Sequence, residues 1–334
     1  MTNSLIQRGF IMKKMLSLLL SAALILGIFA FVGCGKSKKM LNLGFGVYTS
    51  VKASDATEDK NGQGQATVTG AVVLVDSEGK IVKCFIDCAD STVAYTAAGE
   101  AVEASAFATK YEKGADYNMK AYGGATLEWY EQADAFCGAI AGKTLAEVKA
   151  MVAKEDNDVV SAGCTIDVAD FVMAVEKAVN NAAPSEATAN DALKLGVSTA
   201  QSKKDATEDA NGYNQIETTF FAAAINGEGK IVASTADCVQ VKFTFDANGA
   251  STFGETTTVE SKYEKGDAYN MKAYGGATLE WYEQADAFCA LTIGKTANEV
   301  SALLADDNYG TADVKAAGCT VLVDGFAKAA SKVK

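Results

Sequence analysis

The chain has 334 residues, of which 49% are hydrophobic and 22% charged, so it is too apolar to be disordered and long enough for two globular domains. It carries 42 acidic and 30 basic residues, and this acidic balance excludes the basic surface that nucleic-acid binding requires. It contains no histidine, which excludes Ser-His-Asp and Cys-His catalysis and histidine-ligated zinc or haem.

The N-terminus has the pattern of a lipoprotein export signal. Lys13 and Lys14 precede an uncharged apolar run at 15–32, and a Val-Gly-Cys-Gly sequence that contains Cys34 ends the run. We predict that residues 1–33 are removed and that Cys34 becomes the lipidated first residue. The alternative is a plain transmembrane anchor, for which the run is short and is followed by lysines. Both interpretations place the rest of the chain outside the cytoplasm, and we predict a lipid-anchored protein on the extracellular face of the cell membrane.

Beyond the predicted signal, the chain consists of two copies of one sequence. Stretches that match at an offset of 150 residues are 55–62 with 205–212, and 78–82 with 228–232. Because this period far exceeds that of solenoid repeats, it indicates a tandem duplication. We predict a tether at 34–42, a first domain at 43–180, a linker at 181–191 that contains the only proline, and a second domain at 192–334.

Each copy begins with alternating apolar and polar residues and ends with helical periodicity. In the first copy we expect strands at 66–76 and 80–89, joined by a turn at 76–79. The expected helices are 127–140, 145–153 and 169–179. Strands first and helices later predict an α+β fold, here two tandem copies of an antiparallel sheet with helices.

Two motifs suggest other chemistry and are better explained by turns and caps. The stretch 138–144 resembles a phosphate-binding P-loop, but it is one residue short and follows a helix instead of a strand. We expect a helix to end at Gly142 and new helices to begin with capping boxes at Thr144 and Thr296. The acidic stretch 55–59 lacks the spacing of a calcium-binding EF-hand loop, so we expect an exposed turn there and predict no metal site.

Seven cysteines follow Cys34, and six of them match between the copies. The matches are Cys88 with Cys238, Cys137 with Cys289, and Cys164 with Cys319, whereas Cys84 stands alone. Their spacing fits neither a zinc site nor an iron–sulfur cluster. A disulfide between Cys137 and Cys164, and one between their matches, is one interpretation for an exported chain. We favour buried thiols.

One segment recurs almost unchanged, because 110–137 and 262–289 differ only in the order of one Ala–Asp pair. Its two glycines permit a tight turn, and we expect Thr126 and Thr278 to be the N-caps of the helices that follow. The free amides of a helix N-terminus would stabilise a phosphate ester on these threonines. Aromatic and methionine side chains nearby could cover a flat ring. The candidate cofactor-binding residues are Met119, Tyr122, Gly124, Ala125 and Thr126, with Met271, Tyr274, Gly276, Ala277 and Thr278 in the second copy.

The lipobox, the tandem α+β domains, the Lys-Gly-x-x-Tyr-x-Met-Lys run and Gly-Ala-Thr together resemble the FMN-binding-domain lipoproteins of Gram-positive bacteria. The nearest type is the two-domain pheromone lipoprotein of flavin-based extracellular electron transfer. The resemblance implies that a flavin transferase joins FMN through its phosphate to the threonine that ends an Asp-x-x-Ser/Thr-Gly-Ala-Thr motif, here Thr126 and Thr278. Lys120 and Lys272 stand where that motif has aspartate, and glycines stand where it has serine or threonine. The resemblance predicts two FMN groups. Because of these departures from the motif, both covalent and non-covalent binding of FMN stay open.

The resemblance also implies a function. FMN would relay electrons from a membrane NADH dehydrogenase and quinone pool to extracellular acceptors such as ferric iron, with no catalytic side chain of the protein's own. We therefore expect a redox carrier more than an enzyme with its own substrate. The octapeptide 26–33 would be released as a pheromone. The alternative is a non-redox surface lipoprotein, an adhesin or a ligand-binding module, in which the repeated segment is a recognition surface.

Overall fold

The computed structural model describes residues 39–153, 158–254 and 258–333. The predicted signal peptide at 1–33, its octapeptide and the lipidation site Cys34 lie outside the described residues. In the described ranges, no helix is long and apolar enough to cross a membrane. Residues 39–334 form one compact unit that holds both copies of the repeat.

Each copy folds into an antiparallel sheet. The first sheet has the order β4-β3-β2-β1-β5 and consists of β1 (Met40–Ser54), β2 (Gly62–Val75), β3 (Ile81–Tyr95), β4 (Ala101–Val102) and β5 (Ala183–Thr188). The second has the order β6-β7-β8 and consists of β6 (Ala192–Lys204), β7 (Gly212–Ile225) and β8 (Ile231–Phe245). The strands predicted at 66–76 and 80–89 are confirmed in β2 and β3, and the acidic stretch 55–59 is the exposed turn that was expected.

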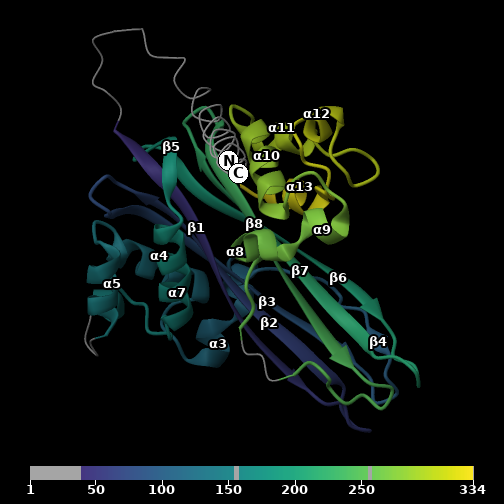
Figure 1. Ribbon diagram of the computed structural model, residues 1–334. Helices are drawn as coiled ribbons and strands as arrows, with labels where there is room; N and C mark the ends of the chain where they lie inside the picture. The colour runs from purple at the N-terminus through teal and green to yellow at the C-terminus, as the bar shows by residue number, and fades with distance from the viewer. Residues whose placement is uncertain (1–38, 154–157, 255–257, 334) are drawn as a thin grey trace, which may run out of the picture. The chain divides into compact units, whose positions relative to one another are not determined.

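The inner faces of the two sheets pack against each other and form one shared core (Figure 1). Side chains from both copies meet there, as in the ring pair of Phe45 and Phe220, whose centroids lie 5.5 Å apart. Val68 of β2 and Val241 of β8 are buried in the same cluster. The apolar positions of each strand pattern therefore bury one face of each sheet against the other copy.

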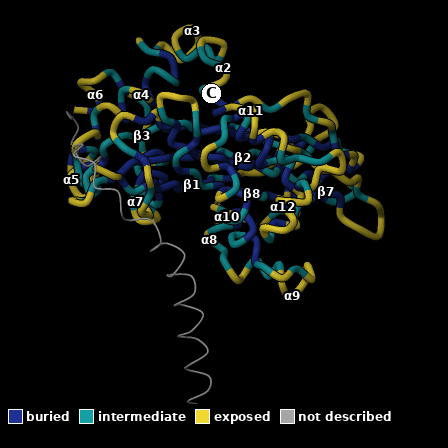
Figure 2. Tube along the Cα trace, turned by 90° about the horizontal axis from the view of Figure 1, so that it is seen from above, coloured by how far each residue is buried: buried dark blue, intermediate teal, exposed yellow. Residues whose placement is uncertain are grey.

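Helices of the same copy cover the outer face of each sheet, so the layers run helix, sheet, sheet, helix. α4 (Trp129–Ile140) and α7 (Ala169–Asn180) cover the first sheet, and α10 (Trp281–Thr292) and α13 (Asp324–Ala330) cover the second. Glycines permit the closest approach. A Cβ on Gly46 would lie 2.3 Å from the backbone nitrogen of Ala178, and one on Gly196 would lie 1.9 Å from the carbonyl oxygen of Ala329. Figure 2 shows the buried residues concentrated in the strands between these helical layers.

Shorter helices connect the layers. They are α2 (Lys110–Lys113), η1 (Gly114–Tyr117), α3 (Met119–Gly123), α5 (Leu145–Val152) and α6 (Asp158–Ser161), followed by α8 (Lys262–Lys265), η2 (Gly266–Tyr269), α9 (Met271–Gly275), α11 (Ala297–Ser301) and α12 (Ala312–Ala316). The three helices predicted in the first copy are confirmed as α4, α5 and α7. Thr144 and Thr296 form the predicted capping boxes, because each hydroxyl accepts the backbone N–H of the glutamate three residues later. The mixed α+β class is therefore confirmed.

The segment at 181–191, which we predicted as a linker, contains β5. This strand pairs antiparallel with β1, and the Ser185 hydroxyl donates to the carbonyl oxygen of Leu41 (2.7 Å). Ion pairs at equivalent positions also cross between the copies, Lys177 with Glu264 and Lys332 with Glu112. The two copies are thus joined along the sheets and not only through the chain.

The seven described cysteines are free thiols, and six of them are buried, as predicted. Among the described residues, neither disulfide considered from the sequence is formed. Burial raises the pKa of Cys88 and Cys238 to about 12, so these two thiols stay protonated at neutral pH.

Candidate functional site

The repeated segment contains a tight loop at 118–128, and the second copy has the same loop at 270–280. A five-residue helix, α3 or α9, lies in each loop between two residues with left-handed backbone. Asn118 and Gly124 have φ angles of 60° and 67°, and their equivalents in the second copy have 59° and 67°. Asparagine and glycine tolerate this conformation best, so these residues define both ends of the short helix.

A glutamate, and not the predicted threonine, begins the helix that follows the loop. Glu128 is the N-cap of α4, and its side chain accepts the backbone N–H of Met119 (2.9 Å). Its own N–H donates to Glu131 (2.8 Å), which also pairs with Lys120 (2.9 Å). The prediction of Thr126 as N-cap is therefore wrong, and Glu280 displaces Thr278 in the same way. In each copy, a pair of glutamates three residues apart forms the hydrogen bonds of the helix N-terminus, so the threonine lies outside the helix.

A buried glutamine holds the residue next to the threonine in place. Gln132 is fully buried, and its amide donates to the carbonyl oxygen of Leu127 (3.0 Å). Its Oε1 accepts the backbone N–H groups of Thr165 (2.9 Å) and Ile166 (3.2 Å). Gln284 makes the same contacts in the second copy. Since every polar atom of this side chain has a partner, the loop has a rigid base.

The predicted site residues lie together on the surface of each copy. Thr126 and Thr278 are exposed, and the neighbouring Tyr122 and Tyr274 are 88% and 90% exposed. The turn is completed by Gly124 and Ala125, and by Gly276 and Ala277 in the second copy. Met119 and Met271 pack against the outer cores instead, so of the side chains expected to cover a ring only the tyrosines are free to do so. The two loops are not brought together, because α3 and α9 lie on opposite sides of the body (Figure 2).

A groove lies on the outer face of the second sheet, beside the helix that follows the loop. It has a volume of about 270 Å³, and Gln215, Glu217 and Trp281 are among its lining residues. Thr278 precedes Trp281 by three residues, so its backbone is at most about 11 Å away. Another groove, of about 500 Å³, is lined by Tyr48 and Thr49 of β1 together with Thr258 to Glu260 of the second copy, so it is not the counterpart of the groove beside Trp281.

A lysine that the sequence analysis did not identify lies against this groove. Lys262 is 6% exposed, its ammonium lies 2.9 Å from Glu217, and the rings of Tyr269 and Trp281 are each 5.4 Å away. Burial alone would lower the pKa of Lys262, but nearby acidic side chains, among them the Glu217 carboxylate that it pairs with, outweigh burial and raise it, so the ammonium stays charged. Lys110 occupies the equivalent place in the first copy, 5.3 Å from Tyr117 and 5.7 Å from Trp129. Lys110 and Lys262 are the first residues of the two recurrent segments, and this repetition was the sequence signal that could have identified them.

Among the described residues, no group of three or more cysteines and carboxylates could hold a metal ion. The chain was also compared with known proteins. No protein-family model, curated protein or solved structure matches it.

Proposed function

We propose that the protein is a membrane-anchored extracellular flavoprotein that carries electrons on two FMN groups, one at Thr126 and one at Thr278. The observation that carries this proposal is the rigid, exposed Gly-Ala-Thr loop, which has the same geometry in both copies. A surface threonine on a fixed loop presents its hydroxyl to a modifying enzyme without unfolding of the protein.

The residues around each loop fit an FMN group. Apart from the glycine itself and its two chain neighbours, no heavy atom lies within 4 Å of where a Cβ on Gly124 or Gly276 would be, so the space beside the threonine is open to a phosphate. The exposed rings of Tyr122 and Tyr274 are available for stacking on a flat ring. When bound, FMN would supply the reversible acceptance of electrons.

The placement of the loops supports two separate carriers. α3 and α9 lie on opposite sides of the shared sheets, so each cofactor would be accessible from a different side (Figure 2). We propose that each is reduced by a membrane NADH dehydrogenase and quinone pool, and that each passes electrons to acceptors such as ferric iron. A lipid anchor at Cys34 would keep both carriers near the extracellular face of the membrane.

The test is the mass of residues 39–334 produced with and without a co-expressed flavin transferase. In the attachment step, the threonine oxygen forms a bond to the phosphorus of the FMN half of FAD, the pyrophosphate bond breaks, and AMP and the hydroxyl proton leave. We expect two FMN increments on the unaltered protein, one on Thr126→Ala or Thr278→Ala, and none on the double variant. Thr207→Ala, on an exposed turn, is the control and should keep both increments.

Absorption separates the proposal from its alternative. Each single threonine variant should retain about half of the flavin absorbance, because the two loops do not depend on each other. A colourless, unmodified protein with and without the transferase would contradict the proposal. It would favour the surface binding module instead, for which the exposed Tyr122 and Tyr274 would be the recognition residues.

A further inference from the structure

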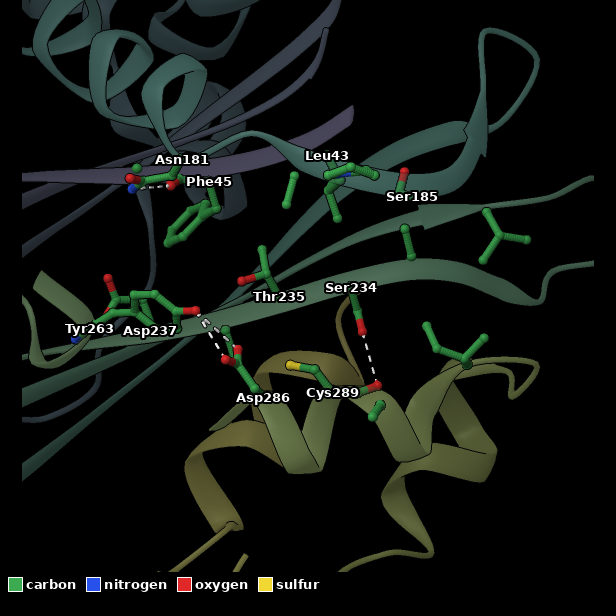
Figure 3. Close-up of a pocket in the computed structure, with 18 of the residues that line it drawn as sticks. Leu43, Phe45, Asn181, Ser185, Ser234, Thr235, Asp237, Tyr263, Asp286 and Cys289 are labelled. Atoms are coloured by element: carbon green, nitrogen blue, oxygen red, sulfur yellow. Dashed lines mark hydrogen bonds between the residues drawn. The ribbon is translucent and has the colours of Figure 1, made fainter. Parts of the chain in front are cut away.

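A large cavity lies where the two copies meet, and none of the residues that line it belongs to either Gly-Ala-Thr loop. It has a volume of about 940 Å³ and opens between β1 and β5 of the first copy and β8, α8 and α10 of the second (Figure 3). Leu43, Phe45 and Ile293 give it an apolar wall, and Thr235, Tyr263 and Asp286 give it a polar one. Its size is that of a site for a small organic molecule.

A single difference between the copies explains much of this space. In the first copy, Phe85 packs against Tyr111 with ring centroids 4.8 Å apart. The equivalent positions in the second copy are Thr235 and Tyr263, and both line the cavity. The short threonine therefore leaves open the space that a phenylalanine ring fills in the first copy.

The charge of the lining has one sign. Its ionisable residues include four carboxylates and no lysine or arginine: Glu186, Asp237, Glu264 and Asp286. Glu264 is paired with Lys177, and Asp237 is buried and accepts the backbone N–H groups of Cys238 (2.6 Å) and Tyr263 (3.0 Å).

Asp286 is the carboxylate best placed to meet a ligand. It is exposed, and its two carboxylate oxygens lie 3.1 and 3.2 Å from the Tyr263 hydroxyl, which donates to them (Figure 3). The tyrosine orients the carboxylate and leaves acceptor capacity for a second donor. Asp286 has no ion-pair partner among the described residues.

We propose that this cavity binds a small organic cation, an amine whose apolar body lies against Leu43 and Phe45 and whose ammonium donates to Asp286. The apolar wall accounts for the body, and the all-acidic lining accounts for the charge. An anionic ligand would face Glu186 and Asp286, which pair with no lysine or arginine among the described residues, and the lining has no basic side chain to offset them. This site is independent of the proposed flavin sites.

The test is a titration of residues 39–334 with benzylamine and with benzyl alcohol, which has a similar shape and no charge. We expect saturable binding of benzylamine with amide shifts confined to the cavity in a nuclear magnetic resonance titration. Benzyl alcohol should bind about tenfold more weakly or less, since a hydrogen bond to a charged group is lost. Equal binding of both probes, or binding of neither, would overturn the proposal.

Two variants test the location. Asp286→Asn should weaken benzylamine binding about tenfold or more, whereas Asp134→Asn, the matched position in the first copy, should not change it. Thr235→Phe copies the side chain that the first copy already accommodates, so it should fill the cavity and abolish binding. If Thr235→Phe fails to fold, the comparison of Asp286→Asn with Asp134→Asn still decides the matter. Equal affinity of these two variants would contradict the assignment.

Discussion

The two copies agree in the recurrent loop and differ at one strand edge. The hydrogen bond from the Met119 N–H to Glu128 is 2.9 Å long, and that from Met271 to Glu280 is 2.7 Å. At the strand edge, the second copy replaces Phe85 by a threonine and Cys84 by a serine. The residues of the loop thus determine its geometry in both copies, whereas the space beside β8 depends on Thr235, where the first copy has Phe85. A duplicated sequence can therefore keep one site twice and acquire another only once.

The largest expected effect tests whether the agreement extends to helix packing. Gly46→Ala and Gly196→Ala should each lower the free energy of unfolding by about 4 kcal/mol or more, because the added Cβ meets helix backbone that cannot move aside. Urea unfolding of each variant measures this. Gly138→Ala is the control, since nothing lies near that Cβ and the second copy already has Ala290 there, and it should stabilise by up to about 1 kcal/mol. Loss of stability in only one of the two strand variants would break the equivalence of the copies.

The buried aspartates sharpen the comparison through pH. Burial, aided by the nearby Glu264 carboxylate, raises the pKa of Asp237 from 3.8 to about 7, and burial raises that of Asp87 to about 6. The folded protein then binds more protons than the unfolded chain between these values, so stability is highest near pH 4 and falls as the pH rises to about 7. Asp237→Asn should remove about 3 kcal/mol of this fall, and Asp87→Asn less.

Urea unfolding at a series of pH values between 4 and 8 measures this effect. The informative quantity is the difference between each variant and the unaltered protein. A difference that stays constant with pH would contradict the buried-carboxylate explanation. An effect of Asp87→Asn larger than that of Asp237→Asn would reverse the order that the two copies predict.

The smallest expected effect is a change in the rate at which one thiol, Cys84, is labelled, with the free energy of unfolding nearly unchanged. Cys84 is the only described cysteine that is not buried, so a thiol reagent should label one site quickly in residues 39–334. Cys84→Ser, which copies Ser234, should remove that fast reaction, and Ser234→Cys should add a second one. Mass spectrometry after timed labelling measures both variants. Fast labelling of Cys137 or Cys289 in the unaltered protein would show that the outer cores open more readily than their burial indicates.

The sequence was sufficient for the elements that depend on local pattern. Alternation predicted β2 and β3, and the threonine and glutamate three residues apart predicted the cap of α5, because these features need only neighbouring residues. The near-identity of the recurrent segment also indicated the loop at Thr126, which is exposed in the folded chain. The site residues themselves remain a prediction until flavin attachment is measured.

The features that the sequence missed depend on distant parts of the chain. Alternation shows that one face of a strand is apolar, but it does not show whether a helix or another sheet covers that face. In the structure, β2 is buried without a break from Val68 to Val75, which shows that both faces of this strand are covered. The segment around Pro184 reads as a linker because its strand partner, β1, lies about 140 residues earlier. The N-cap of α4 was missed because glutamate is not among the residues preferred at that position, although Glu128 forms a capping box with Glu131.

The shared core has a consequence for how the chain folds. Synthesis proceeds from the N-terminus, so β1 to β3 are complete while the strands that cover their inner face have not yet been made. Phe45, Val47 and Val68 then remain in contact with water until β6 to β8 arrive. Closure of this core requires contacts between residues far apart in the chain, which slows folding. A first copy released alone would keep an apolar sheet face uncovered, and the nearest surface able to cover it would be the same face of another chain.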